Sequence, residues 1–150
     1  SQLNGAFRPI VFSTHPMDEP VAQELANLLS TAVIENRTLL SHDIQAVMRE
    51  CELFIGMRFH SVILASAVGT PIVGLIYAPK VRGFMRQLGC EDFSLELGDL
   101  TVENLSERIV AAWNSRGELR KRQQSVIEGL RIAAKNAAKL IKDRYFSSQI

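Results

Sequence analysis

The sequence predicts an α/β fold in which a Rossmann-like parallel sheet is flanked by helices and a long helix ends the chain. The main observation is that short apolar runs of strand length alternate with amphipathic stretches of helical period through most of the 150 residues. Such an alternation is typical of parallel strands joined by right-handed helical crossovers. A second observation is the hydrophobic content of 47%, which lets a chain of this length bury one substantial core. We therefore expect residues 1–150 to form a single domain.

The first third of the chain contains two predicted strands with a helix between them. Residues 8–13 (RPIVFS) form the first strand, and His15 lies in the turn that follows. A helix is predicted over residues 19–30, and a second, shorter strand over residues 31–35 (TAVIE). The next helix begins at Ser41, whose side chain can cap its first turn. The apolar stripe of the first helix consists of Val21, Leu25, Leu28 and Leu29.

The middle of the chain is a predicted strand–helix–strand unit. The apolar strand 53–56 ends in a glycine turn, and residues 59–68 are apolar almost all round, as in a helix buried against a sheet. Residues 71–77 restore a strand. Two glycines meet backbone requirements here: Gly69 as a helix C-cap and Gly74 as a close approach of the strand to a neighbour.

The last third is predicted to be mostly helical. A short helix over residues 81–88 is closed by Gly89, and residues 93–97 (FSLEL) alternate as a fifth strand does. A helix follows over residues 101–115, and a long one over residues 117–145. The long helix carries one apolar stripe, made of Leu119, Val126, Ile127, Leu130, Ala133, Ala134, Ala137, Leu140 and Ile141.

The segment 55–61 (IGMRFHS) carries the clearest functional signal. It joins the third predicted strand to the apolar helix and places Arg58 and His60 at the carboxyl end of that strand. In open α/β sheets this edge is where ligands bind, and a cation beside a titratable imidazole suits an anionic ligand. The competing interpretation is a structural cap or a surface pair.

Composition excludes several classes of function. A net charge of +1 argues against a nucleic-acid binder driven by bulk charge. The sequence contains neither a membrane-spanning apolar run nor a signal peptide, so we expect a cytoplasmic protein. Cys51 and Cys90 lack metal-ligand spacing and are expected to be reduced thiols. We expect no bound metal and no cofactor.

The motif GMRFHS, the apolar helix after it, GTPIV and YAPK follow one another between residues 43 and 89. In this order they resemble the C-terminal half of the polysaccharide pyruvyl transferase family. The resemblance implies transfer of a pyruvyl group from phosphoenolpyruvate to sugar hydroxyls, which forms a ketal on a cell-surface polysaccharide or its lipid-linked precursor. It also implies a GT-B-like fold of two Rossmann-like halves. This chain would be the C-terminal, donor-binding half, and without the N-terminal half it would be inactive.

The resemblance also implies roles for individual residues. Arg58 would bind the phosphate or the carboxylate of the donor, and His60 would act in catalysis by protonating the methylene carbon or by holding the phosphate. Ser61 would donate a hydrogen bond near the helix start, and Lys80 would add positive charge. His15 follows the first strand on the expected ligand edge and would contact donor or acceptor. For Lys80 and His15 a merely solvated side chain is the competing interpretation.

Two other functions are compatible with the sequence. The first is the donor half of a nucleotide-sugar glycosyltransferase, for which Glu91 and Asp92 are the nearest candidates to bind a ribose. The second is a non-catalytic α/β interaction domain. The long last helix is rich in Lys and Arg. It can be a solvated basic face, a peripheral contact with the inner face of an anionic plasma membrane, or a segment that crosses back onto the N-terminal half.

Overall fold

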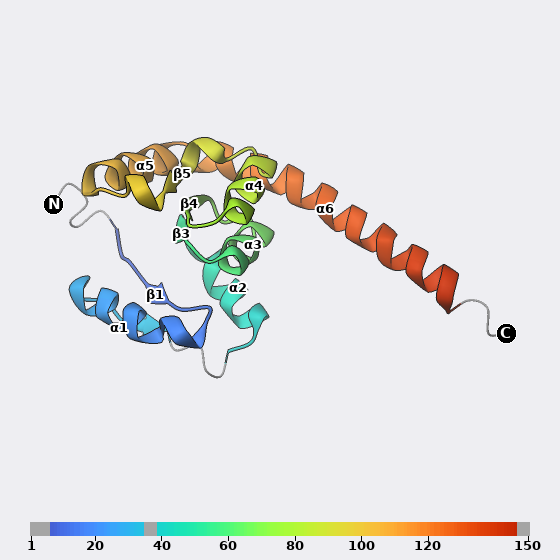
Figure 1. Cartoon of the computed structure of the whole chain (residues 1–150), viewed down its shortest axis with the longest axis horizontal. Helices are drawn as coiled ribbons and strands as arrows, with labels where there is room; N and C mark the ends of the chain where they lie inside the picture. The colour runs from blue at the N-terminus through green and yellow to red at the C-terminus, as the bar shows by residue number, and fades with distance from the viewer. Residues whose placement is uncertain (1–6, 35–38, 147–150) are drawn as a thin grey trace. The chain divides into compact units, whose positions relative to one another are not determined.

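The computed structural model describes residues 7–34 and 39–146, which form an α/β fold with parallel strands, flanking helices and a long C-terminal helix (Figure 1). The predicted fold class is therefore confirmed. The chain divides into two compact units, residues 1–47 and residues 48–150. Each unit contains its own parallel sheet, of two and of three strands, where one sheet was expected. The single-domain assignment stays a prediction.

The first unit has a short two-stranded sheet and one well-packed helix. Its strands pair in parallel, with Val11 opposite Val33, and its core consists of Val11 with Ala22 and Ala26. The strand β1 is shorter than predicted and β2 begins two residues later than predicted, because Pro9 has no backbone N–H for a ladder and its carbonyl instead accepts from the Thr31 hydroxyl at 2.6 Å. The predicted end of the second strand, residue 35, lies outside the described residues. The elements are β1 (Val11–Phe12), a 3₁₀ turn (Pro16–Asp18), α1 (Glu19–Leu28), β2 (Val33–Ile34) and α2 (Ser41–Arg49).

Two sequence-based expectations for this unit are wrong. The buried face of α1 consists of the small residues Ala22 and Ala26, and the larger apolar side chains predicted to face inward are exposed. Ser41 is the first helical residue of α2 and not its cap. The Asp43 carboxylate reaches back to accept from the Leu40 N–H at 2.9 Å, and so satisfies one of the unpaired donors that every helix start leaves. The exposed α1 residues are Val21, Leu25, Leu28 and Leu29.

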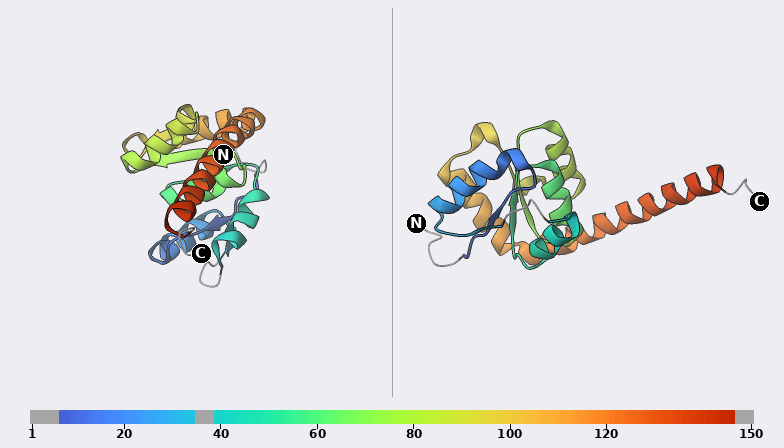
Figure 2. Two further views of the ribbon diagram at one scale, coloured as in Figure 1. Left: turned by 90° about the vertical axis from the view of Figure 1, so that its right-hand side faces the viewer. Right: turned by 90° about the horizontal axis from the view of Figure 1, so that it is seen from below.

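The second unit is built on a three-stranded parallel sheet in the order β3-β4-β5. The helix α3 connects β3 to β4, and α4 connects β4 to β5. Right-handed crossovers put both helices on one face of the sheet, where they contact each other. The helix α5 packs against β4 and β5 from the other face (Figure 2). The elements are β3 (Phe54–Gly56), α3 (Phe59–Ala67), β4 (Ile72–Ile76), α4 (Pro79–Gln87), β5 (Ser94–Glu96), α5 (Val102–Asn114) and α6 (Arg116–Tyr145), with 3₁₀ turns at Glu91–Phe93 and Leu97–Asp99.

Three glycines have the roles that the sequence predicts. Gly69 and Gly89 follow α3 and α4 with positive φ angles of 82° and 66°, the left-handed conformation of a helix C-cap. Gly74 lies at the centre of β4, where a Cβ atom would sit 3.0 Å from the Cγ and Sδ atoms of the buried Met85. The central strand therefore lies closely against α4. Gly56 is the last residue of β3, where the predicted strand ends, and Ile55 beside it is 43% exposed.

The first half of α6 packs against the ends of α3 and α4. Leu119, Gln123 and Ile127 are its buried residues. Two arginines bind the carbonyl ends of the other helices: Arg122 donates to the Gly89 carbonyl and Arg131 to the Ala67 carbonyl, both at 2.6 Å. Cations at these positions also compensate the negative ends of the helix dipoles. The predicted apolar stripe is thus buried only up to Ile127, and residues 131–146 are exposed.

Gln123 should be replaceable with a gain in stability. It is fully buried, its Nε2 atom donates to the Thr70 carbonyl at a long 3.4 Å, and within the described chain its Oε1 atom accepts no hydrogen bond. We expect Gln123→Met to raise the free energy of unfolding by about 1 kcal/mol, because an unsatisfied buried oxygen is removed at nearly constant volume. Urea denaturation measures this, and Gln123→Glu should destabilise the protein strongly by burying a charge. A Met variant less stable than the parent would show that the Thr70 contact outweighs the orphan oxygen.

Two further findings concern membrane-spanning helices and the two cysteines. None of the helices within residues 7–34 and 39–146 combines the length and the apolarity needed to cross a bilayer. Cys51 and Cys90 are both free thiols, and burial raises the pKa of Cys90 to about 11. Cys90 is therefore an unreactive core residue.

Candidate anion-binding site

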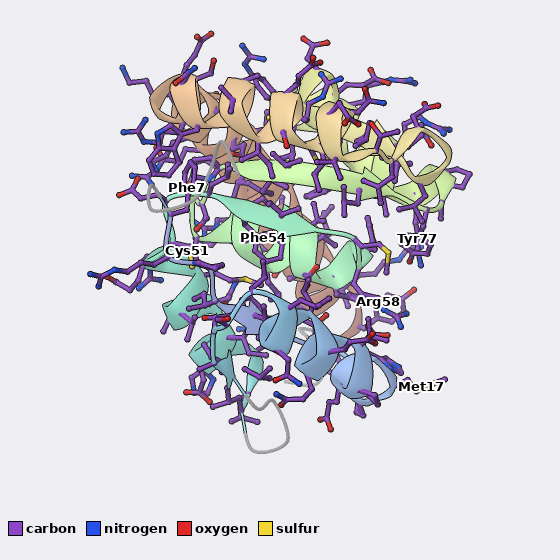
Figure 3. All side chains as sticks on the ribbon, turned by 90° about the vertical axis from the view of Figure 1, so that its left-hand side faces the viewer. Phe7, Met17, Cys51, Phe54, Arg58 and Tyr77 are labelled. Carbon is purple, nitrogen blue, oxygen red and sulfur yellow. The ribbon has the colours of Figure 1, made fainter. Side chains whose placement is uncertain are left out.

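Two strands of the second unit end side by side and each leads into a helix. The strands β3 and β4 are parallel, with Gly56 opposite Gly74, so the chain leaves both at the same edge of the sheet. Figure 3 shows Arg58 and Tyr77 together at this end, away from Cys51 at the other. The N-termini of α3 and α4, which begin at Phe59 and Pro79, therefore belong to one region.

Arg58 is the N-cap residue of α3 and is half-buried. Its backbone is extended and its side chain makes no capping hydrogen bond. The carbonyl of Arg58 accepts from the buried Ser61 hydroxyl at 2.7 Å. The hydrogen of Ser61 is thus used within the turn that positions Arg58, and its predicted donation to a ligand stays a prediction.

The Phe59 ring lies close to both Lys80 and His60. The Lys80 Nζ atom lies 5.6 Å from the centre of the Phe59 ring and 5.7 Å from that of Tyr77, which is a cation–π distance for both rings. The His60 ring lies 5.9 Å from Phe59, and the Phe84 ring packs edge-on at the same distance. Lys80 on α4 is therefore held beside the first turn of α3.

His60 is exposed in the first turn of α3. In the part of the chain that the structure describes, neither of its ring nitrogens makes a hydrogen bond. Its contact with Phe59 uses only the face or edge of the ring. Both nitrogens are accordingly available to exchange a proton with a ligand or to bind one.

The charged residues at the starts of α3 and α4 are cations. Neither α3 nor α4 has an acidic residue in its first turn, so the partial positive charges of the two helix starts are uncompensated from within those turns. Arg58 and Lys80 add two full charges. The strand β5 ends in Glu96, but Arg82 binds this carboxylate with an Nη2–Oε1 distance of 2.6 Å. The arrangement suits a ligand with more than one negative group.

Tyr77, Phe59 and the Arg82–Glu96 pair are the residues at this edge for which the sequence suggested no role. Phe59 stands between Arg58 and His60, and Tyr77 stands three residues before Lys80, so a search for aromatic partners of Lys80 would have found both. The ion pair needs the register of β5 against β4, which places Glu96 opposite Ile76. No local pattern encodes that pairing.

His15 belongs to the first unit and has a structural contact there. Its Nδ1 atom accepts from the Met17 N–H at 3.2 Å and so caps the 3₁₀ turn after β1. The accepting nitrogen carries no proton, so the neutral imidazole has its hydrogen on Nε2. A role of His15 toward a ligand stays a prediction.

Glu91 and Asp92, the candidates for a ribose contact, precede β5 and hence lie at the amino end of that strand. Arg86 binds the Glu91 carboxylate through two hydrogen bonds of 2.7 and 3.0 Å, and this hydrogen bonding lowers the pKa of Glu91. The Asp92 carbonyl accepts from Arg108. The Glu91 carboxylate is therefore engaged, and both residues lie at the sheet end opposite to Arg58.

Residues 6–79 match the family model described as polysaccharide pyruvyl transferase. The match contains Arg58, His60 and Tyr77 and ends immediately before Lys80. Over these residues the chain is similar to the polysaccharide pyruvyl transferase family. The resemblance inferred over residues 43–89 is thereby confirmed for the family, and the match extends further toward the N-terminus than expected.

The chain is also similar to a curated protein, the amylovoran biosynthesis protein AmsJ of Erwinia amylovora. The two are 29% identical over 82 residues, which cover 55% of this chain and 20% of AmsJ. The matched part therefore corresponds to about a fifth of that relative. No solved structure matches the chain.

Proposed function

We propose that this chain supplies the donor-binding part of an enzyme that transfers a pyruvyl group from phosphoenolpyruvate to sugar hydroxyls. The product would be a pyruvate ketal on a cell-surface polysaccharide or its lipid-linked precursor. The observation that carries the proposal is the convergence of Arg58, His60 and Lys80 on the starts of α3 and α4, where the first turns lack acidic residues. Similarity to the family and the name of the relative, which refers to amylovoran biosynthesis, support the same class of reaction.

The chemistry of the donor fits this edge of the sheet. Phosphoenolpyruvate carries a carboxylate and a phosphate on one enol carbon, so its site needs at least two cationic groups close together. The Arg58 guanidinium can bind either group through two parallel hydrogen bonds, and Lys80 can act as a point charge on the other. Backbone N–H groups at the two helix starts can bind the remaining oxygens.

His60 is assigned the proton transfer. A sugar hydroxyl attacks the enol carbon and passes its proton to the departing phosphate, while the methylene carbon takes up a proton that an imidazolium at this position can donate. Phosphate then leaves, and a second hydroxyl of the same sugar attacks the carbon to close the ketal, releasing its proton to the now neutral imidazole. Bonds and protons balance over the two steps, and the scheme uses side chains of the chain itself.

We further propose that the chain is one Rossmann-like half of a GT-B-like enzyme and that the acceptor site lies mainly on another half. The alternative of a nucleotide-sugar donor is less well supported, because the acidic candidates for a ribose contact precede β5 while Arg58 follows β3. A nucleotide-sugar is therefore the natural control ligand.

The direct test is a titration of the isotope-labelled chain with phosphoenolpyruvate, followed by amide NMR. We expect shifts concentrated at residues 57–61 and at Lys80 and Val81, the N–H groups at the two helix starts. Inorganic phosphate should move the same signals more weakly, because it lacks the carboxylate, and UDP-glucose should leave them in place. Shifts with UDP-glucose alone would favour the glycosyltransferase, and silence with every ligand would contradict a donor site in this chain.

A second experiment distinguishes proton transfer by His60 from binding of phosphoenolpyruvate. In the two-domain enzyme that the sequence predicts, we expect His60→Gln to lower kcat by about 10²- to 10⁴-fold, the usual contribution of a general acid. The KM for phosphoenolpyruvate should change little, because Arg58 and Lys80 remain. A variant that raised KM and left kcat unchanged would show that His60 binds the phosphate without transferring a proton.

A further inference from the structure

The second half of α6 extends away from the rest of its unit. The helix is 30 residues long, and all of the residues from Arg131 to Tyr145 are exposed. Figures 1 and 2 show this part of the helix projecting past the sheet and helices of the second unit. At 1.5 Å per residue the projecting segment measures about 22 Å. It is therefore an element that the unit itself does not cover.

The projecting segment is amphipathic. Its apolar residues recur at helical spacing along one face, and the largest of them are well exposed: Leu140 is 70% and Ile141 56% accessible. Ala and Lys are the commonest residues of the segment, and both favour a helix without tertiary support. The apolar face, which continues from the packed half, consists of Leu130, Ala133, Ala134, Ala137, Leu140 and Ile141.

The opposite face of the helix is basic. Lys135, Lys139 and Lys142 lie next to one another at spacings of four and three residues. Across residues 7–34 and 39–146, these three lysines form no ion pair with another described residue. Asp143 is the single acidic residue between 131 and 146, against five basic ones. The segment thus carries a charge of +4, although the chain as a whole carries +1.

We propose that residues 131–146 bind the surface of an anionic lipid bilayer, with the helix lying in the plane of the interface. The apolar face enters the boundary between headgroups and acyl chains, and the lysines of the opposite face add electrostatic attraction to the anionic surface, which lies within about one Debye length. An exposed segment with an apolar face and an excess of positive charge matches both the apolar interior and the negative charge of this surface.

The two other occupants of such a face fit less well. A second copy of the helix would bring two segments of charge +4 together over a seam in which half of the six apolar residues are alanine. A nucleic acid would satisfy the lysines but would leave Leu140 and Ile141 exposed. The anionic bilayer is the partner that uses both faces.

The test is co-sedimentation of the 150-residue chain with vesicles of phosphatidylcholine containing about 30% phosphatidylglycerol. We expect partitioning that is absent with pure phosphatidylcholine and that weakens between about 0.1 and 0.5 M salt. Each lysine near an anionic surface contributes about fivefold, so Lys135→Ala with Lys139→Ala should weaken partitioning about 25-fold. Leu140→Gln with Ile141→Gln should weaken it about tenfold or more while leaving the charge unchanged.

The matched control removes two exposed charges elsewhere. Arg49→Ala with Lys121→Ala changes the net charge equally and should leave partitioning within about twofold, because neither residue lies on the projecting segment. Circular dichroism should report the same helix content for all variants. The proposal is overturned if the control weakens binding as much as the lysine variant or if the chain ignores anionic vesicles. It is likewise overturned if the chain binds duplex DNA more tightly than anionic vesicles. The same holds if the chain forms a dimer that the Leu140→Gln, Ile141→Gln variant does not form.

Discussion

Replacing Arg58 with alanine is expected to weaken binding of phosphoenolpyruvate by about a hundredfold. The expectation follows from the loss of two charge-assisted hydrogen bonds, each of which contributes about 1.5 kcal/mol or more to binding. The turn itself does not depend on the Arg58 side chain for its cap, because it is fixed through the Arg58 carbonyl and Ser61. Calorimetric titration of the chain measures the affinity, and thermal unfolding checks the fold.

Two further variants make the Arg58 result specific. Arg58→Lys keeps the charge and loses the planar fork, so we expect a loss of about tenfold in affinity, intermediate between the parent and the alanine variant. Arg86→Ala removes an arginine at the opposite end of α4, where it binds Glu91, and should leave the affinity unchanged. Equal losses in Arg58→Ala and Arg86→Ala would mean that only the overall charge attracts the ligand.

The largest effect on stability is expected at the centre of the second sheet. Gly74→Val should lower the free energy of unfolding by about 3 kcal/mol. Gly74 and Met85 are both fully or almost fully buried, and even one added Cβ atom would lie 3.0 Å from two atoms of the Met85 side chain. The two further methyl groups of valine have no space, so α4 must move away from β4. Urea denaturation followed by circular dichroism gives the change.

A second-site substitution and a control identify the cause. Met85→Ala in the Gly74→Val background should recover part of the lost stability, since it vacates the space that the valine needs, although it is itself destabilising in the parent. Gly83→Ala, also on α4, meets no atom within 4 Å and should stabilise the protein by about 0.5–1 kcal/mol through helix propensity. Additive effects of Gly74→Val and Met85→Ala would rule out the contact as the origin.

The two predictions are linked through α4. The start of this helix carries Lys80 toward the Phe59 ring, and its middle carries Met85 against Gly74. A displacement of α4 by Gly74→Val should therefore also move Lys80 away from α3. The close approach of helix and strand is thus a structural condition of the candidate site.

Local chemistry in the sequence was sufficient for the predicted fold class and for the central features of the site. Alternating apolar runs predicted parallel strands with helical crossovers, and the glycines after α3 and α4 predicted their ends. The order of GMRFHS, GTPIV and YAPK predicted the family and placed Arg58 and His60 at a strand end. These features are encoded locally because backbone conformation at a glycine and periodicity of side chains depend on few neighbours.

Tertiary structure decided which apolar residues are buried and which side chains meet. The stripes of α1 and of the second half of α6 have the same period as buried stripes, yet both are exposed, because burial requires a partner surface that periodicity does not specify. Likewise, Lys80 and Phe59 are 21 positions apart, and the parallel pairing of β3 with β4 is what brings them within 5.6 Å. A pattern of spacing describes one element at a time, whereas a binding site arises where several elements end together.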